Sequence, residues 1–208
     1  MEIKNYVDLS SMEIDALREI GNIGTGNAGT VLSQMIGEEV SITLPEVHIM
    51  GYNEAIEWIG GPEAVTAGVL AQLKGDINGI ILTVQKLDFV NLALRAILGT
   101  EISSFSELNE LQISALTEVG NIMGASFINA MSNLADMTVN LTAPAFAVDM
   151  QGAILAVPMA VYGGQSDYIM TIGGNFQCKE QKAPCRILLS PDIQSLNHLL
   201  RKLGVIDE

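Results

Sequence analysis

A carboxylate and an amide stand three residues apart at two places in this chain. Glu19 precedes Asn22 in the first pair, and Glu118 precedes Asn121 in the second. In a helix this spacing puts both side chains of a pair on one face, about one turn apart. A carboxylate can bind a cation, and an amide can both donate and accept hydrogen bonds. Each pair is therefore a candidate for positioning a polar reactant.

The two pairs lie at equivalent places in an internal repeat. Residues Asp15–Ile23 recur as Ser114–Ile122 at a constant offset of 99 residues, and six of the eight positions 16–23 are identical in the two copies. The same offset continues without a gap to Pro45 and Pro144. Such self-similarity indicates a duplicated unit of about a hundred residues. The sequence therefore predicts two copies related by pseudo-twofold symmetry, each built around an equivalent helix.

A helical wheel separates a polar face from an apolar face in each copy. The polar faces carry Asp15, Glu19 and Asn22 in the first helix, and Ser114, Glu118 and Asn121 in the second. The predicted core faces carry Leu17, Ile20, Gly24, Val31 and Met35 in the first helix, and Leu116, Val119, Met123, Ala130 and Leu134 in the second. Both copies are thus expected to present a carboxylate and an amide away from the core.

An exposed polar face is ordinary for an amphipathic helix, so the carboxylates alone also fit solvent-facing residues. Asparagine is harder to explain, because inside a helix it costs about 0.5 kcal/mol relative to alanine, and an adjacent glycine costs as much or more. Both copies repeat this combination, as Gly21-Asn22 and Gly120-Asn121. Two equivalent departures from helix propensity indicate a site, and the glycine indicates close approach of another chain or helix. Pro45 and Pro144 also fit simple punctuation of strand ends.

Each long helix is predicted to lead into an alternating strand and then into a β-hairpin. These elements are expected at 11–35, 39–47, 65–73 and 78–84 in the first copy, and at 106–134, 137–148, 153–161 and 168–176 in the second, whose hairpin turns around 163–165. A helix over 88–98 links the copies, and a last helix over 192–203 is expected to follow Ser190 as its cap and Pro191 as its first residue. The sequence thus predicts an α+β fold, with one internally duplicated domain over 1–208, repeats at about 11–99 and 106–208, and an antiparallel sheet covered by helices.

The composition excludes several classes of protein. The chain has 208 residues, 49% of them hydrophobic, which suffices for a full core without disulfide or metal staples. Its formal charge of −14 would repel the phosphates of nucleic acids and of anionic membrane surfaces. No apolar run approaches the roughly 20 residues of a membrane span, and no secretory signal is visible. We therefore predict a cytoplasmic protein with neither nucleic-acid nor membrane partners.

Two patterns that often mark sites do not support one here. Cys178 and Cys185 have six residues between them, and His48 and His198 are scattered, so the spacing predicts no zinc site. A disulfide is not expected in a cytosolic chain. Residues 24–29 fit the G-x-G-x-x-G pattern of dinucleotide-binding loops. That pattern requires a strand before the glycines, whereas a helix is predicted there, and the second copy lacks the glycines.

Each copy of the repeat reads Asp or Ser, three residues, Glu, two residues, Asn, twenty-two residues and Pro. The pattern is carried by Asp15, Glu19, Asn22 and Pro45 in the first copy, and by Ser114, Glu118, Asn121 and Pro144 in the second. It resembles the motif of the CheC/CheX/FliY family of chemotaxis phosphatases. Two intact copies in a chain of this size resemble the CheC branch most, because the CheX branch usually keeps one motif and the FliY branch carries a further domain.

This resemblance implies hydrolysis of the aspartyl phosphate of the chemotaxis response regulator CheY. It implies that the two glutamates bind a lysine near the phosphorylated aspartate, and that Asn22 and Asn121 orient the attacking water. An acyl phosphate is already activated, so positioning a water in line with the phosphorus suffices without a covalent intermediate. No cofactor of the chain's own is expected, and the Mg²⁺ would belong to the regulator.

Members of this family also bind CheD, a receptor deamidase. The resemblance suggests Asp149 as a contact with CheD, although this residue fits a polar strand end equally well. The alternative to a phosphatase is therefore a non-catalytic adaptor that binds CheD or a response regulator. The intact asparagine in both copies favours the enzyme, because an adaptor has less need of the amide.

Overall fold

The computed structural model describes residues 3–43, 46–162 and 167–206 of the chain, in which one order of elements occurs twice. The first copy comprises α1 (Ser11–Ile36), β1 (Val40–Ile42), β2 (Glu46–Gly51), α2 (Tyr52–Ile59), β3 (Val65–Gly75), β4 (Gly79–Gln85) and α3 (Leu87–Leu98). The second comprises α4 (Glu110–Ala135), β5 (Val139–Leu141), β6 (Ala145–Met150), α5 (Gln151–Tyr162), β7 (Tyr168–Cys178), β8 (Gln181–Pro191) and α6 (Ile193–Lys202). Short 3-10 helices, η1 (Tyr6–Asp8) and η2 (Phe105–Glu107), precede α1 and α4. The predicted internal duplication is confirmed.

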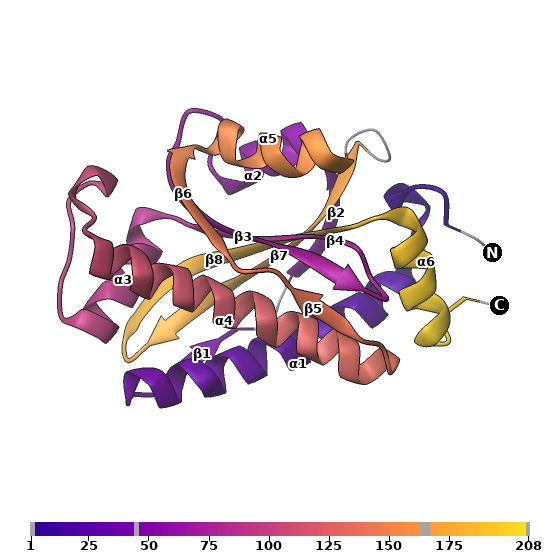
Figure 1. Cartoon of the computed structure of the whole chain (residues 1–208), viewed down its shortest axis with the longest axis horizontal. Helices are drawn as coiled ribbons and strands as arrows, with labels where there is room; N and C mark the ends of the chain where they lie inside the picture. The colour runs from indigo at the N-terminus through magenta and orange to yellow at the C-terminus, as the bar shows by residue number, and fades with distance from the viewer. Residues whose placement is uncertain (1–2, 44–45, 163–166, 207–208) are drawn as a thin grey trace.

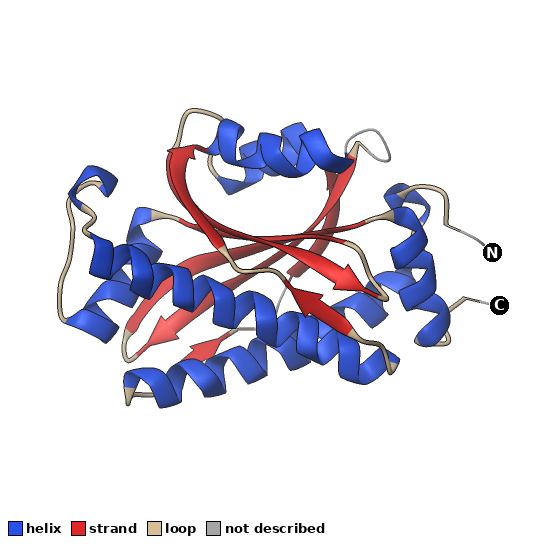
Figure 2. Ribbon diagram, in the orientation of Figure 1, coloured by secondary structure: helices blue, strands red, loops and turns tan. Residues whose placement is uncertain are grey.

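The eight described strands form one antiparallel sheet, drawn in red in Figure 2. The strand order is β1-β7-β8-β4-β3-β5, with β2 also pairing with β7 and β6 also pairing with β3. The two copies interleave, because β7 and β8 of the second copy lie between β1 and β4 of the first. At the centre β4 pairs with β8, and Ile81 lies opposite Leu189. The α+β fold with an antiparallel sheet is therefore confirmed.

Helices cover both faces of the curled sheet (Figure 1). The long helices α1 and α4 lie together on one face, α2 and α5 lie on the other, and α3 and α6 lie toward opposite ends. The larger part of the core lies beneath α1 and α4 and includes Phe127 and Ile81. A smaller part lies beneath α2 and α5 and includes Leu82 and Ile154. Because β4 is central and covered on both faces, every residue in it is buried, which explains its continuous apolar run.

The first and second copies are also joined at the chain's two ends. The amide oxygen of Asn197 in α6 accepts a hydrogen bond from the Ile3 N–H at 2.7 Å, and its Nδ2 donates to the Ile3 carbonyl at 2.6 Å. The Tyr6 hydroxyl donates to the Pro191 carbonyl at 2.6 Å. Asn197 and Tyr6 are buried, so these bonds hold the segment before α1 against the last helix of the second copy.

The strand predicted over 153–161 is wrong, because these residues belong to helix α5. Ile154 and Leu155 are buried on the sheet, whereas Val157 is 46% exposed, as expected for one covered side of a helix. The hairpin of the second copy is instead formed by β7 and β8, and residues 181–191 occupy the place beside β4. A short apolar run does not by itself distinguish a buried strand from a helix.

Three smaller differences concern the ends of elements. The strands predicted over 39–47 and 137–148 are each divided in two, and helix α2 was not predicted. The last helix is capped by Asp192, whose carboxylate accepts the Ser195 N–H at 2.7 Å, while Pro191 ends β8, so the predicted cap at Ser190 is wrong. The turn predicted around 163–165 lies outside the described residues.

The predicted core face of the long helices is correct in their first halves and at Ala130, but wrong at three residues closer to the helix ends. Leu17, Ile20 and Gly24 are buried, but Val31 and Met35 are 43% and 40% exposed, as is Leu134 at 44%. In the last turns of α1 a different side of the helix is covered, because strand β1 lies alongside these turns. The Val40 N–H of β1 donates a hydrogen bond to the Ser33 hydroxyl of α1. A wheel assumes one flat core, so it cannot show that a second surface packs against part of a helix.

Neither cysteine forms a disulfide, and both are buried. Burial raises the pKa of the Cys185 thiol to about 11. Burial also raises the pKa of Cys178, and the nearby Glu38 carboxylate adds to this increase. Both thiols are therefore kept in the protonated form, which is a poor nucleophile. Among the described residues, no helix combines the length and apolar character that a membrane crossing requires.

Candidate functional site

Each long helix begins about two turns before the glutamate of its Glu/Asn pair, and its start is fixed by a capping box. In α1 the Glu13 carboxylate accepts the N–H of Ser10, the residue before the helix. In α4 the Asn109 side chain accepts the Gln112 N–H at 3.0 Å, and the Gln112 side chain accepts the Asn109 N–H at 3.1 Å. These bonds satisfy N–H groups that have no partner inside the helix. The two caps thus fix where the pairs fall on their helices.

Glycines let the two helices approach their neighbours closely. A Cβ atom on Gly24 would lie 2.7 Å from the Cα of Phe127, so α1 and α4 touch backbone to backbone at this point. A Cβ on Gly120, beside Asn121, would lie 2.7 Å from both the Thr83 Oγ1 and the Val69 Cβ. The close approach expected of the glycine beside an asparagine is therefore confirmed at Gly120, where the neighbour is the sheet, whereas in α1 the close contact is at Gly24.

The first pair is exposed and internally bonded. Asp15 and Glu19 of α1 are exposed, and Asn22 of the same helix is half-buried. The Asn22 Nδ2 donates to the Glu19 Oε2 at 3.3 Å, while its Oδ1 is buried and has no partner among the described residues. One turn earlier, the Arg18 guanidinium forms an ion pair with Asp15. Pro45, the fourth residue of this motif, lies outside the described residues.

The second pair has the same placement without the internal bonds. Ser114 and Glu118 are exposed and Asn121 is half-buried, and no hydrogen bond joins Glu118 to Asn121 in the described part of the chain. Asn121 and Pro144 line one small pocket, together with Gly120. The structure thus brings together an asparagine and a proline that are 23 positions apart in the sequence. Thr117, which replaces Arg18, donates its hydroxyl to the Ile113 carbonyl at 2.7 Å.

The two pairs lie toward opposite edges of the sheet. Strands β1 and β2 form one edge, and β5 and β6 form the other. Helix α1 packs along β1, where the Ser33 hydroxyl accepts the Val40 N–H at 2.8 Å. Helix α4 lies beside the β5 edge, since Asn121 shares its pocket with Leu141. A partner bound to one pair would therefore approach a different flank of the molecule from a partner bound to the other.

Asp149 is exposed but does not belong to either pair. It lies on β6 opposite Thr66, five residues beyond Pro144, which corresponds to about 16 Å along an extended strand. Its carboxylate accepts the N–H of the next residue, Met150, at 2.7 Å. Exposed Val148 and Met150 flank it. If Asp149 binds a partner, it does so at a surface separate from the Glu/Asn pairs.

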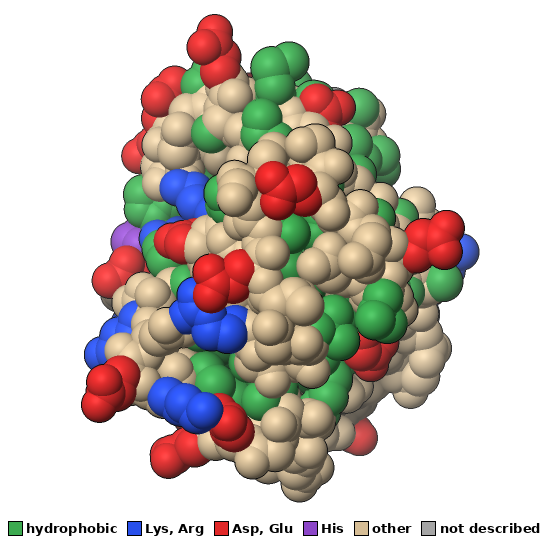
Figure 3. Space-filling view, turned by 90° about the vertical axis from the view of Figure 1, so that its left-hand side faces the viewer, with side chains coloured by type: hydrophobic (Ala, Val, Ile, Leu, Met, Phe, Trp, Pro, Cys, Tyr) green, Lys and Arg blue, Asp and Glu red, His purple; other side chains and the backbone are tan. Residues whose placement is uncertain are grey.

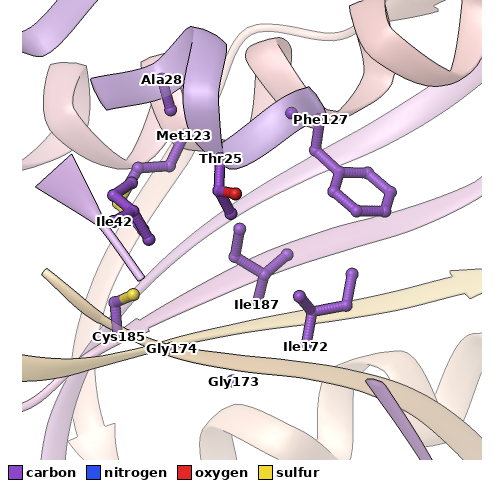
Figure 4. A pocket seen from close by; sticks show the side chains of 11 residues that line it. Thr25, Ala28, Ile42, Met123, Phe127, Ile172, Gly173, Gly174, Cys185 and Ile187 are labelled. Carbon is purple, nitrogen blue, oxygen red and sulfur yellow. The ribbon is translucent and has the colours of Figure 1, made fainter. Parts of the chain in front are cut away.

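The glycine pattern over 24–29 lies inside α1 and forms no loop. Gly24, Thr25 and Ala28 face Ile172 and Ile187 of the sheet across a narrow apolar crevice (Figure 4). The crevice offers no row of free N–H groups for a phosphate, because these residues are in the helix interior. The dinucleotide interpretation is therefore excluded for this segment.

Away from the Glu/Asn faces, ion pairs join only a few of the described charged side chains. Figure 3 shows the end of the molecule near α3, where Lys and Arg side chains lie beside Asp and Glu side chains. Lys179 contacts Glu38 at 2.6 Å, and Arg95 forms an ion pair with Glu101. Among the described residues, no group of three or more His, Cys, Asp or Glu side chains could hold a metal ion. The Glu/Asn pairs therefore remain the arrangement best suited to chemistry.

The two Glu/Asn pairs lie in segments that match a known protein family. The model of the CheC-like family matches residues 12–49 and 111–148, which contain both motifs from Asp15 and Ser114 onward. The chain is also 23% identical over 196 residues to the CheY-P phosphatase CheC of Bacillus subtilis, covering 92% of this chain and 94% of that protein. The chain belongs to the CheC-like family. The resemblance predicted from the spaced motif is thus confirmed at the level of the family.

Solved structures of this family group share the fold. FliY of Thermotoga maritima superimposes with a TM-score of 0.75 at 21% identity, covering 94% of this chain and 98% of that one. CheX from Borrelia burgdorferi, in a complex with CheY, BeF3 and Mg²⁺, superimposes with a TM-score of 0.52 at 17% identity, covering 84% of this chain and 99% of that one. At these identities the likeness extends to the fold, including the curled sheet with two long helices on one face.

Two residues near the pairs were missed by sequence reasoning. Gln85, which is buried, donates its Nε2 to the Leu116 carbonyl at 3.0 Å and so ties α4 to the end of β4. A polar residue at the end of an otherwise apolar strand was the signal for it. The second residue is Arg18, which the sequence reasoning treated only as one member of the repeat. It is the single basic residue within 15–22, and its counterpart Thr117 in the second copy is neutral. This difference in charge was the signal for it.

Proposed function

We propose that this chain is a phosphatase that hydrolyses the aspartyl phosphate of a CheY-like response regulator. The observation that carries the proposal is the duplicated placement of an exposed glutamate and a half-buried asparagine on equivalent long helices. The membership of the CheC-like family supports it, as does the likeness to the CheY-P phosphatase CheC. The cytoplasm, where a response regulator would be met, is the proposed location.

In the proposed reaction the asparagine amide holds a water in line with the phosphorus. The water oxygen forms a bond to phosphorus while the bond from phosphorus to the aspartate oxygen breaks, giving inorganic phosphate and a free aspartate carboxylate. An amide suits this task because one group both donates and accepts hydrogen bonds. At the second pair, Asn121 has no hydrogen bond to Glu118 to break before it can act.

The glutamates serve as anchors for the partner. Glu19 and Glu118 are exposed, so a lysine of the regulator can reach either carboxylate without burial of an unpaired charge. Asp15 and Ser114 lie one turn earlier on the same faces and would complete the contact. Pro144, which lines the pocket beside Asn121, would hold the edge of the sheet against the helix, and Pro45 is proposed to act likewise. The Mg²⁺ needed for charge neutralisation would be bound by the regulator.

The decisive measurement is the decay of a phosphorylated CheY-like regulator in the presence of this protein. Wild type should accelerate the decay, Asn22→Ala and Asn121→Ala should each remove part of the acceleration, and the double variant should return the decay to the regulator's own rate. Asn129→Ala is the matched control, because Asn129 is an exposed asparagine on α4 outside the motif and should leave the rate unchanged. Circular dichroism would establish that each variant is folded.

A wild-type protein that does not accelerate the decay, with or without a CheD protein, would refute the phosphatase. The alternative is then the adaptor. Asp149→Lys should weaken binding to CheD in that case, because an exposed carboxylate on β6 is replaced by a cation without disturbing a buried contact. A retained acceleration in the double asparagine variant would also refute the proposed role of the amides.

A further inference from the structure

The faces that carry the two Glu/Asn pairs differ at two charged positions, because Ser114 stands in place of Asp15 and Thr117 stands in place of Arg18. Within the described part of the chain, Arg18 has an ion pair only with Asp15, which lies three residues earlier on the same helix. The Arg18 and Asp15 side chains are 47% and 65% exposed. An exposed pair of this kind contributes little to stability. The stability of α1 therefore does not account for the cation at this place, and its exposure leaves it accessible to a partner.

The position of Arg18 puts it within the face that carries the first pair. On the helical wheel it lies next to Asp15 and Asn22, and it immediately precedes Glu19 in the chain. The face thus presents two neighbouring carboxylates, Asp15 and Glu19, with the Arg18 guanidinium at its edge, on the side of Asp15 away from Glu19. A guanidinium offers five donors in a planar fork, which suits a carboxylate or phosphate acceptor. A partner matched to this face needs an acidic group at the Arg18 edge in addition to the cation that binds Glu19.

The second face lacks this feature in both charge and geometry. Ser114 and Thr117 are neutral, so the single charge of the face belongs to Glu118. The Thr117 hydroxyl is turned back to the Ile113 carbonyl at 2.7 Å and is not offered to a partner. Both faces carry the same formal charge of −1, so they differ in the arrangement of charge and not in its sum.

We infer that Arg18 is a specificity-determining residue of the first site, where it binds an acidic group of the regulator near the phosphorylated aspartate. This inference rests on the proposed phosphatase function. It makes the two sites unequal: the first favours a regulator with an acidic group at that place and is sensitive to salt, and the second does not distinguish such regulators. A charge at the rim of an interface acts chiefly on association, so Arg18 should affect KM and leave kcat unchanged.

The test isolates each site and exchanges the differing residue. In the Asn121→Ala background, which leaves the first site alone, Arg18→Thr should raise KM for the phosphorylated regulator about two- to fivefold at low salt. The difference should vanish near 0.5 M salt, because exposed charges are screened within a few ångströms there. Arg18→Lys should restore most of the affinity. In the Asn22→Ala background, Thr117→Arg should lower KM and increase the dependence of KM on salt.

The outcomes separate this inference from the proposed function. If wild type does not accelerate the decay, the proposed function fails. If wild type is active but Asn121→Ala is inactive, the first site is idle and the inference is overturned. The inference is also overturned if Arg18→Thr leaves KM unchanged at low salt, or if its effect persists at high salt, since the latter indicates a structural role. A loss of kcat with constant KM would likewise contradict it.

Discussion

The glycine next to Asn121 offers a direct test of how the sheet positions the second site. A Cβ added at Gly120 would lie 2.7 Å from the Thr83 Oγ1 and from the Val69 Cβ, both in buried residues of the sheet. To reach ordinary contact at about 3.4 Å, α4 would have to move away from the sheet by about 0.7 Å. Gly120→Ala therefore displaces Asn121 as well as straining the core.

The expected change in stability follows from two opposing terms. Alanine is favoured over glycine inside a helix by about 1 kcal/mol, whereas overpacking a core costs about 1–3 kcal/mol. Gly120→Ala should thus lower the free energy of unfolding by about 0–2 kcal/mol. Gly26→Ala is the matched control, because Gly26 also lies in the interior of a long helix but a Cβ there meets nothing within 4 Å. That substitution should raise the free energy of unfolding by about 1 kcal/mol.

Urea unfolding followed by circular dichroism gives the free energy of unfolding of both variants. The decay of the phosphorylated regulator, measured in the Asn22→Ala background, reports the activity of the second site alone. We expect Gly120→Ala to reduce the remaining phosphatase rate while Gly26→Ala leaves it unchanged. A misplacement of about 1 Å in a positioning group can cost up to about a hundredfold in rate. If Gly120→Ala stabilises the protein as much as Gly26→Ala does, α4 does not pack on the sheet closely enough to exclude a Cβ atom at this position.

Two further predictions concern the whole fold. The fragments 1–104 and 105–208, expressed separately, should fail to give cooperative unfolding transitions, because β7 and β8 of the second copy lie between strands of the first; a sharp transition for either fragment alone would contradict the proposal that 1–208 is a single domain. In the native protein, Cys185 should react with iodoacetamide at pH 8 at least about a hundredfold more slowly than in urea, since a pKa of about 11 leaves roughly a hundredth of the usual thiolate. Equal rates measured by mass spectrometry would show that the thiol is exposed.

The local parts of the site were predictable from the sequence. The spacing of Asp15, Glu19 and Asn22 fixes a shared face because the α-helix has a constant 3.6-residue turn. The recurrence at 99 residues predicted the duplication, and the spaced motif predicted the family. These inferences need only the local geometry of a helix and a comparison of the two halves of the sequence, so they do not depend on the tertiary structure.

The errors arose where distant residues compete for one place. The run Ala153–Val161 resembles a strand, yet residues 181–191 occupy the position beside β4 and the run becomes α5 over the other face. Val31 and Met35 looked like core residues, but the covered side of α1 turns toward β1 in its last turns. Neither outcome can be read from a segment by itself, because each depends on which other segment packs against it.

The sequence by itself determined that this chain carries two equivalent Glu/Asn faces, because the residues of each face lie within two turns of one helix. Only the tertiary structure decided that the faces lie toward opposite edges of one interleaved sheet, that Pro144 lies beside Asn121, and that Asn22 is bonded to Glu19 whereas Asn121 is free of Glu118. Helical periodicity is a property of neighbouring residues, whereas strand order and side-chain partners are set by the packing of the whole chain.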